Sequence, residues 1–367
     1  MADVSRRDFL HRGGKTAGGL LLLGGLSPLI AACGDDNNGG GGSARSSGDG
    51  KPAAKVNPKP KIGLSSSPQA SYLPVIAGPV MAGSKYGLSI AKSDVTVLDS
   101  STTLTQSTLS GQVQIAGQST IAHLLLIDRG QPFKIFATYS LSDDFVIASR
   151  GDVTSIAQLK DPKTVVASDS PGGAGQAVFD AMLEAAKAGF MVDDIPKKVI
   201  VESSGERASA LASGDCDATV IHLVQANAIQ KEKGDVHILA KLYGQVPNFM
   251  KEAYAARADW LDDNLETAAA VTASVIQSSR DLLKDYSAFD AAVKQMIEEP
   301  PAEGDLKAVY EIIKANPVYP TDGGLSDERI QYMIDLGKRE GILKSDLTPD
   351  KVLDRRVMDR ALQLVGA

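Results

Sequence analysis

Small hydrogen-bonding side chains gather in the loops that follow the predicted strands, and their types suit the binding of a ligand. Serine, threonine, glutamine and tyrosine donate and accept hydrogen bonds, while glycine lets a ligand approach the backbone. Loops that lead into helices also offer free N–H groups and the positive end of the helix dipole, which favour an anionic or strongly polar group. The residues expected to bind the ligand are Ser66, Ser67, Gln69, Tyr72, Ser100, Gln118, Ser119, Thr120, Tyr139, Ser170, Gly172, Gly173 and His222.

The same residue types also have a purely structural use. Serine and threonine cap helix N-termini without any ligand, and about half of these residues would serve only as caps. Gly172 and Gly173 suit a turn as well as a ligand contact, and Tyr72 and Tyr139 suit either a stacked ligand or the edge of a core. His123 lies within an apolar helix face and is expected to be structural. Both uses stay open from the sequence.

No sequence motif of a known catalytic or metal centre is present. There is no paired-cysteine motif, no His-Glu-x-x-His and no nucleophilic serine elbow. Gly173-Ala174-Gly175 follows a predicted strand, but the third small residue of a dinucleotide loop would fall on Val178. Cys216 lies between Asp215 and Asp217, whose charges would raise the pKa of its thiol. We therefore expect no enzyme activity, catalytic residue, metal or cofactor.

The elements that position these loops are predicted by an internal repeat. Ser67-Pro68, Val97-Leu98-Asp99-Ser100-Ser101 and Ser110-Gly111 each have a similar segment 103 residues later in the chain. Recurrence at one offset favours duplication of a supersecondary unit, with shared fold geometry as the alternative. Each copy alternates short β-rich runs with amphipathic helices, which predicts parallel strands joined by crossover helices.

The repeat predicts an α/β fold of two doubly wound, Rossmann-like lobes joined by two crossover segments, with helices at the C-terminus. Lobe I is expected to comprise residues 61–145 and 245–367, and lobe II residues 146–244. The two crossings are expected at 133–149 and 236–256, so that a ligand cleft would lie between the lobes. The last helices are expected over 325–336 and 349–364, capped by Ser326 and Thr348.

The start of the chain has the pattern of an export signal. Arg6-Arg7 precedes a short, Gly-rich apolar run, and Ala31-Ala32-Cys33 resembles a lipobox, in which the cysteine becomes a lipidated first residue. Residues 1–32 are therefore expected to be a twin-arginine lipoprotein signal peptide, and 33–60 a flexible tether rich in Gly, Asp, Asn and Ser. A short transmembrane anchor is the alternative, although the run is shorter than the roughly 20 apolar residues that span a bilayer.

Composition limits the classes of partner. The chain has 38 Lys and Arg against 45 Asp and Glu, a net charge of −7, which argues against nucleic acid and against a polybasic membrane patch. If Cys33 is acylated, Cys216 is the only remaining thiol, so no internal disulfide can form. Stability must then come from burial.

Four segments carry a resemblance to a known family, which runs from about Lys61 to Leu364. The segments are Leu109-Ser110-Gly111-Gln112-Val113-Gln114-Ile115-Ala116, Asp128-Arg129-Gly130-Gln131-Pro132-Phe133-Lys134-Ile135, Val153-Thr154-Ser155-Ile156-Ala157-Gln158-Leu159-Lys160 and Ala210-Leu211-Ala212-Ser213-Gly214-Asp215-Cys216-Asp217-Ala218. Through them the chain resembles the extracytoplasmic solute-binding proteins of ABC transporters in the sulfonate, nitrate and thiamine-pyrimidine group.

The resemblance implies a type II periplasmic-binding-protein fold that closes on a small molecule by hinge motion. It also implies an ABC permease and ATPase as partners, a location outside the cytoplasm, and a monomer tethered to the membrane through Cys33. No Arg or Lys falls in the predicted loops, so a polar organic ligand of the sulfonate or nitrogen-heterocycle type is favoured over nitrate. Asp143 and Asp144 suit a cationic or amino-bearing heterocycle.

Two other functions stay open. An enzyme on the same fold, similar to desulfinases or pyrimidine synthases, would use a reactive cysteine or histidine, and Cys216 with His222 six residues later is the candidate pair. A ligand-sensing lipoprotein would use the same cleft for signalling. Consumption of the ligand would distinguish the first of these from a binding protein.

Overall fold

The structure is a computed structural model that describes residues 55–98 and 100–366. Lys51–Ala367 form one compact unit. The twin-arginine segment, Cys33 and most of the expected tether lie outside the described residues. Among the residues that are described, no helix has the length and apolar character needed to cross a bilayer.

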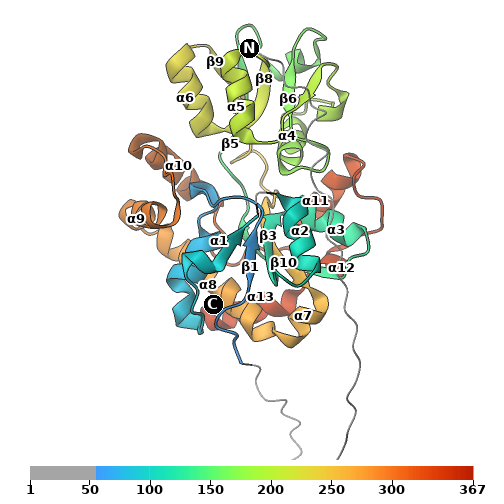
Figure 1. The fold of residues 1–367 in the computed structure, drawn as a ribbon. Helices are drawn as coiled ribbons and strands as arrows, with labels where there is room; N and C mark the ends of the chain where they lie inside the picture. The colour runs from blue at the N-terminus through green and yellow to red at the C-terminus, as the bar shows by residue number, and fades with distance from the viewer. Residues whose placement is uncertain (1–54, 99, 367) are drawn as a thin grey trace, which may run out of the picture. The chain divides into compact units, whose positions relative to one another are not determined.

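Two five-stranded mixed sheets form the centre of the molecule (Figure 1). The first has the order β2-β1-β3-β10-β4 and the second β7-β6-β8-β5-β9, and we refer to the parts built on them as lobe I and lobe II. The strands of lobe I are β1 (Ile62–Leu64), β2 (Val95–Val97), β3 (Ile115–Ser119), β4 (Phe133–Ser140) and β10 (Glu252–Arg257). Those of lobe II are β5 (Phe145–Arg150), β6 (Val166–Ser168), β7 (Lys198–Ile200), β8 (Ala218–His222) and β9 (Val236–Lys241).

The expected α/β fold class is confirmed, but each sheet contains a reversed strand. β10 pairs antiparallel with β3 and β4, and β5 pairs antiparallel with β8 and β9, while β1, β2 and β3 are parallel, as are β6, β7 and β8. The chain leaves lobe I at the end of β4 and returns at the start of β10. Since β4 ends and β10 begins at the same end of the sheet, β10 must run in the opposite direction to β4.

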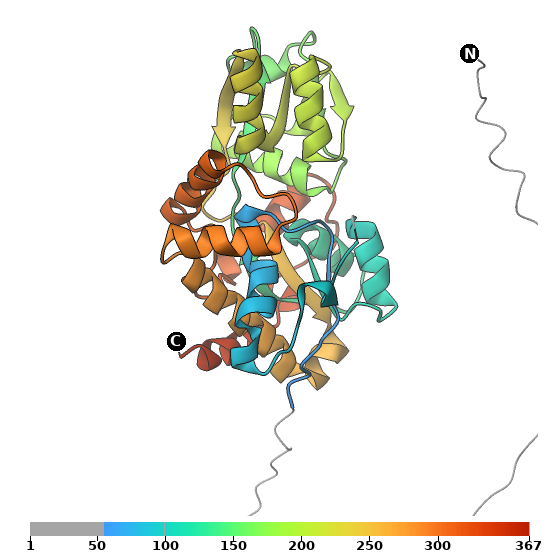
Figure 2. The same cartoon turned by 60° about the vertical axis from the view of Figure 1, so that its left-hand side comes forward.

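Helices cover both sheets and extend from lobe I. They are α1 (Pro74–Ala77), α2 (Ser101–Leu109), α3 (Thr120–Asp128), α4 (Ala174–Ala185), α5 (Ser204–Ser213), α6 (Leu223–Lys233), α7 (Ala258–Asp263), α8 (Leu265–Leu282), α9 (Tyr286–Met296), α10 (Glu303–Ala315), α11 (Asp327–Arg339), α12 (Pro349–Val352) and α13 (Arg355–Leu364). Six short helices complete the described part of the chain. One of them, η1 (Ala70–Tyr72), precedes α1, and two follow it directly, η2 (Gly78–Ala82) and η3 (Gly83–Tyr86). The other three are η4 (Lys92–Asp94), η5 (Ile156–Lys160) and η6 (Val192–Asp194). Figures 1 and 2 both place α10 beside the lower end of lobe II.

The two lobes repeat the same local design. β7, α5, β8 and α6 begin 103 residues after β2, α2, β3 and α3, respectively, which agrees with the offset found in the sequence. Ser100 Oγ accepts the N–H of Thr103 at 3.1 Å, and Ser203 Oγ accepts the N–H of Glu206 at the same distance. Corresponding serines therefore cap corresponding helices.

The C-terminal helices follow the expectation except at one point. Ser326 caps α11 by accepting the N–H of Arg329 at 3.3 Å, as expected. The helix expected over 349–364 is broken, because Leu353 is extended and bridges to Ile135, and the N–H of Asp354 donates to the Ile135 carbonyl at 2.9 Å. Thr348 forms no side-chain cap, and Asp354 instead caps α13. Pairing with β4 outweighs continuation of the helix.

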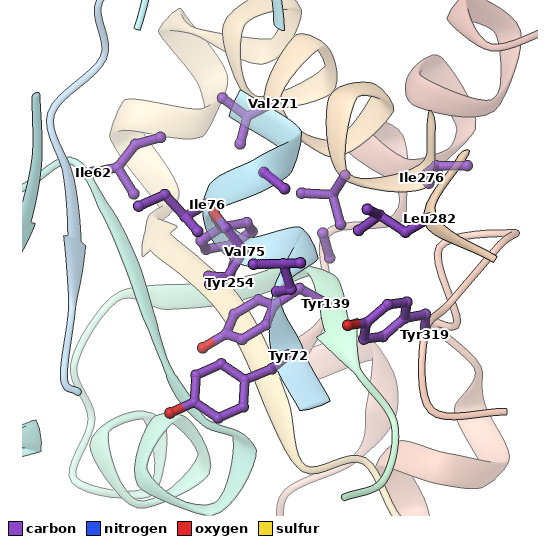
Figure 3. Close-up of a cluster of buried hydrophobic side chains, with 14 of the residues drawn as sticks. Ile62, Tyr72, Val75, Ile76, Tyr139, Tyr254, Val271, Ile276, Leu282 and Tyr319 are labelled. Atoms are coloured by element: carbon purple, nitrogen blue, oxygen red, sulfur yellow. The ribbon is translucent and has the colours of Figure 1, made fainter. Parts of the chain in front are cut away.

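Two large apolar cores support the lobes. The first lies in lobe I, where α1 and α8 pack against the sheet through residues that include Ile62, Val75, Ile76 and Val271 (Figure 3). The second joins residues of lobe II to residues of α3 and α11. The lobes therefore share a continuous core on the side where α11 packs against both α3 and α4.

Candidate ligand-binding site

A cavity of about 1370 Å³ lies between the lobes. On the side of lobe I, the cavity is lined by the loop into η1, by part of η4 and β2, and by the segment between α9 and α10. On the side of lobe II, it is lined by Asp144 and by the junction of β8 and α6. Its polar lining residues are Ser67, Gln69, Ser71, Lys92, Ser93, Asp144, His222, Gln225, Glu298 and Glu299. A ligand in this cavity would contact both lobes.

A buried cluster of charged groups lies beside the cavity, where the two crossing segments meet. Asp143 and Asp144 lie between β4 and β5, Lys251 and Glu252 lie at the start of β10, and His222 ends β8. All five residues are less than one-tenth exposed. The fold brings them together because both crossings pass the same edge of the two sheets.

The cluster consists of two ion pairs that share neighbours. The Lys251 ammonium contacts the Asp143 carboxylate, and Lys251 Nζ lies 3.6 Å from Glu252 Oε1. His222 Nδ1 donates to Asp144 Oδ1 at 2.6 Å, and the N–H of Asp144 donates to Asp143 Oδ1 at 2.8 Å. Each buried charge thus has a partner, which offsets the cost of removing it from water.

The protonation states follow from these contacts. Burial opposes ionisation of Asp143, but Lys251 and His222 together hold the pKa of its carboxyl below the usual value. Burial alone would lower the pKa of His222, yet Asp144 and Asp143 raise it above its usual value. For Asp144, burial dominates and raises the pKa. His222 is therefore favoured as an imidazolium, and its Nε2 has no hydrogen-bond partner within the described part of the chain.

Aromatic rings enclose this cluster. Phe145 stacks on His222 with ring centroids 4.0 Å apart, and Lys251 Nζ lies 4.7 Å from the centroid of Tyr72. The Tyr72 hydroxyl donates to the Ser67 carbonyl at 2.8 Å, and the Tyr139 hydroxyl donates to Glu252 Oε2 at 3.1 Å. Figure 3 shows the hydroxyls of Tyr72 and Tyr139 pointing to the same side of the apolar cluster.

The cluster also has the spacing of metal ligands. Ligand atoms of Asp143, Asp144 and His222 lie within 4.8 Å of one another. Asp143, however, already contacts an ammonium group, and Asp144 holds the proton on His222 Nδ1. Because these side chains balance the charge among themselves, we assign no metal to the cluster.

The residues expected from the sequence fall into three groups. Ser67, Gln69 and His222 line the cavity, and Ser66 and Tyr72 lie directly behind them, with Ser66 Oγ 3.4 Å from the Tyr72 hydroxyl. Tyr139 contacts Glu252 in the charged cluster but does not line the cavity.

A second group lies within lobe I. Ser100 caps α2, and Ser119 is the N-cap residue of α3. Gln118 Nε2 donates to His123 Nδ1 at 3.3 Å, and His123 Nε2 donates to the Ala253 carbonyl at 3.1 Å. Burial lowers the pKa of His123 to about 4, so this histidine is neutral and structural, as expected. Gln118 Oε1 and Thr120 Oγ1 are buried and lack a hydrogen-bond partner among the described residues.

The third group is the loop between β6 and α4. The N–H of Ser170 donates to Asp169 Oδ1 at 2.8 Å, and Gly173 is the N-cap residue of α4. Gly172 has a φ of +80°, and a β-carbon there would lie 3.6 Å from Leu125 Cδ2 of α3. None of these three residues lines the cavity described above.

Part of the site was not predicted from the sequence. Lys92, Glu298 and Glu299 line the cavity, and Lys251 is buried in the cluster, although no Arg or Lys was expected near the ligand. One signal was available, because Lys251-Glu252 are consecutive charges within an otherwise apolar run that leads into the return strand. Cys216 is fully buried and burial raises the pKa of its thiol to about 12, as expected for an inert residue.

The chain matches one family of known proteins. The family described as NMT1/THI5 like matches residues 92–286, just over half of the chain. A comparison with curated proteins found no match.

Several solved structures are similar to this one. The alkanesulfonate-binding protein SsuA from Xanthomonas axonopodis, bound to MOPS, is 17% identical with a TM-score of 0.60 and covers 82% of this chain and 100% of its own. SsuA from Escherichia coli is 16% identical with a TM-score of 0.60, over 84% of this chain and 99% of its own. The nitrate-binding protein NrtA from Synechocystis is 16% identical with a TM-score of 0.60, over 84% of this chain and 89% of its own. At these identities the structures establish a shared fold, and the family match establishes that the chain belongs to the NMT1/THI5-like family.

Proposed function

We propose that the protein is an extracytoplasmic solute-binding lipoprotein that captures a small polar organic ligand between two lobes and delivers it to an ABC importer. The observation that supports this most is the large cavity whose lining comes from both lobes around two crossing segments. Ligand contacts with both lobes favour the closed state by the difference in contact energy between open and closed forms. The similar solved structures include sulfonate- and nitrate-binding components of transporters.

The ligand is returned unchanged in this proposal. The one free cysteine in the described residues, Cys216, is buried with a raised thiol pKa, so it offers no nucleophile. The imidazole of His222 is engaged by Asp144 through Nδ1, which leaves Nε2–H as a hydrogen-bond donor to a ligand rather than a base.

The charges of the cavity favour a nitrogen heterocycle over a sulfonate. Asp144, Glu298 and Glu299 contribute negative charge to the lining, against positive charge from Lys92 and protonated His222. The Asp144 carboxylate can accept a hydrogen bond from an amino group of the ligand, and the neighbouring His222 N–H can donate one to a ring nitrogen. A nitrogen heterocycle with an amino group next to a ring nitrogen offers both partners. A sulfonate would meet the carboxylates without a matching excess of cations.

A thermal-shift screen with ligand recovery tests the binding function. Purified protein is heated with sulfonates, nitrate, carboxylates, pyrimidines and flavins, and the ligand is assayed after incubation. A ligand at 100 times its dissociation constant stabilises the folded state by about 2.7 kcal/mol. Stabilisation by an intact pyrimidine is expected. A consumed ligand would instead indicate an enzyme, and stabilisation by sulfonates alone would contradict the proposed ligand class.

We propose export by the twin-arginine route and anchoring through Cys33. Arg6-Arg7 and Ala31-Ala32-Cys33 support this. Residues 33–60 would then tether the two lobes to the membrane, and the protein would act as a monomer. In this proposal lobe I comprises residues 61–145 and 245–367, and lobe II comprises residues 146–244. Labelling cells with a radioactive fatty acid should mark the wild-type protein and not Cys33→Ser, while Arg6→Lys with Arg7→Lys should block export.

A further inference from the structure

Two acidic side chains, Asp180 and Glu340, lie at the junction of α4 and α11 and have buried carboxylate oxygens without a hydrogen-bond partner among the described residues. Asp180 in α4 is fully buried, and its Oδ1 accepts the N–H of Val192 at 2.6 Å. Its Oδ2, and both carboxylate oxygens of Glu340 at the C-terminal end of α11, are buried without a hydrogen-bond partner among the described residues. Buried carboxylate oxygens are costly unless something donates to them.

The two carboxyl groups are close enough for each to shift the pKa of the other. This contact connects parts of the molecule that belong to different lobes, since α4 packs on the sheet of lobe II and α11 packs on α3 of lobe I as well as on α4. Glu184 of α4 lies near the same junction, where its Oε2 accepts the Tyr332 hydroxyl at 2.9 Å and Arg339 Nη2 at 2.8 Å.

The cation that faces the pair, Arg339, is already engaged by Glu184. Gln176 and Asp193 face Asp180, and Asp193 and Arg339 face Glu340. Asp193 forms an ion pair with Lys198, and Arg339 forms its ion pair with Glu184. Burial, and then the charge of Asp193, raise the pKa of Asp180 to about 6. Burial, and then Asp180, raise the pKa of Glu340 to about 9.

A metal ion is a poorer fit than a proton. The unpartnered buried oxygens here are Gln176 Oε1, Asp180 Oδ2 and the two of Glu340. A calcium ion takes roughly six to eight oxygen ligands, and magnesium keeps an octahedral shell. A single proton needs only one oxygen from each carboxyl group, which the pair supplies.

We infer that Asp180 and Glu340 share one proton at neutral pH, in a carboxyl–carboxylate hydrogen bond that fastens lobe II to α11. When alkali removes this proton, two carboxylates face each other in a buried site and the junction is weakened. Since the ordinary pKa of a glutamate is about 4.3, unfolding at neutral pH frees the proton. The stabilisation is therefore greatest in acid and is lost as pH rises toward the pKa of the folded pair.

The test compares the full chain with Glu340→Gln and with the control Glu184→Gln, all without ligand. Glutamine at 340 donates an N–H to Asp180 and carries no titrating proton. We expect wild type to release about one more proton on unfolding at pH 7.5 than Glu340→Gln does, measured by calorimetry in buffers of different ionisation enthalpy. One extra proton released on unfolding lowers the folding equilibrium constant tenfold for each unit by which pH rises. Between pH 6 and 8, the folding constant of wild type should therefore fall about tenfold per pH unit relative to that of Glu340→Gln.

Equal proton release by wild type and Glu340→Gln would overturn the inference. If Glu340→Gln does not fold, Asp180→Asn replaces it in the same comparison. Loss of wild-type stability on addition of a chelator would also overturn the inference, in favour of a bound cation. Glu184→Gln should release the same number of protons as wild type, and a reduced number would move the shared proton to that residue.

A second measurement rests on the proposed function. If closure of the lobes changes the α4–α11 contact, the affinity for the ligand found in the screen should change more between pH 7 and 10 in wild type than in Glu340→Gln, in which the titration of His222 in the cavity remains. Because proton release is measured without ligand, it remains decisive even if the proposed function fails.

Discussion

His222 Nδ1 and Asp144 Oδ1 lie 2.6 Å apart, although Asp144 lies in the first crossing and His222, 78 residues later, ends β8 in lobe II. Their pairing fixes which ring nitrogen faces Asp144 and leaves Nε2 for the cavity, which both residues line. The N–H of Leu223, next to His222, also donates to the Asp144 carbonyl at 3.0 Å. One carboxylate-bearing residue therefore orients the imidazole and the start of α6 together.

Replacing His222 should cost stability in a pH-dependent way. His222→Gln removes a buried charged hydrogen bond, which we expect to lower the free energy of unfolding by about 1–3 kcal/mol at pH 6. The pKa of folded His222 is raised above its unfolded value of about 6.5. The stabilisation is thus complete below that value and is lost as pH rises through the folded pKa.

Urea unfolding of wild type and His222→Gln at several values from pH 6 to 9 measures this difference, which should shrink as pH rises. His237→Gln is the matched control, because the ring of His237 hydrogen-bonds the Gly151 carbonyl at 3.0 Å and does not line the cavity. A difference that stays constant with pH would show that His222 acts through packing against Phe145 rather than through its charge.

Lys251 and Asp143 should behave as one unit in stability measurements. Lys251→Met leaves the Asp143 carboxylate buried without its cation, so we expect a loss of about 3–5 kcal/mol. Adding Asp143→Asn to that variant removes the uncompensated charge, and the double variant should lose much less than the sum of the single losses. Chemical denaturation of the four proteins gives the coupling energy.

An exposed pair provides the control for this cycle. Lys294 Nζ lies 2.6 Å from Asp290 Oδ2, and the Lys294 side chain is 65% exposed. Lys294→Met should cost less than about 1 kcal/mol. Additive losses at Lys251 and Asp143 would mean that water or a ligand, rather than the partner side chain, stabilises each of these charges.

Cavity residues and capping residues should separate in binding assays. Ser67→Ala with Gln69→Ala removes two hydrogen-bonding groups from the cavity lining, and at about 0.5–1.5 kcal/mol each this corresponds to binding that is roughly 5- to 150-fold weaker. Ser100→Ala removes a helix cap, so it should lower stability by about 1 kcal/mol and leave affinity unchanged. Isothermal titration calorimetry measures the affinity of each variant, and chemical denaturation measures its stability. If Ser100→Ala weakens binding and the double variant does not, the ligand does not bind at Ser67 and Gln69.

The local elements could be predicted because their signals are local. Ser100 and Ser203 directly precede corresponding helices, and each accepts the N–H of the residue three positions ahead, so neighbouring residues alone determine these starts. The reversed strand β10 could not be predicted in this way. Its direction depends on where the chain leaves lobe I, which is a property of the topology and not of the residues 252–257 themselves.

The charged cluster was hidden for a related reason. Lys251 and Asp143 are 108 residues apart, and only the meeting of the two crossings brings them into contact. Asp143 and Asp144 could be singled out as carboxylates near a crossing, but nothing in the neighbouring sequence shows that Lys251 neutralises the first of them. Long-range pairs of buried charges need the topology before they can be assigned.

Gly78 should be irreplaceable for a steric reason that one substitution can test. A β-carbon at Gly78 would lie 2.8 Å from Val275 Cα, so Gly78→Ala must push η2 away from α8, and overpacking of this kind costs about 1–3 kcal/mol. Gly205, in α5, has no atom within 4 Å of the corresponding position, and Gly205→Ala should stabilise the protein by about 0.4–1 kcal/mol through the unfolded chain. Thermal unfolding of the two variants should therefore shift in opposite directions from wild type. An unchanged melting temperature for Gly78→Ala would show that the two helices can move apart without loss, and that the backbone contact between them does not limit their packing.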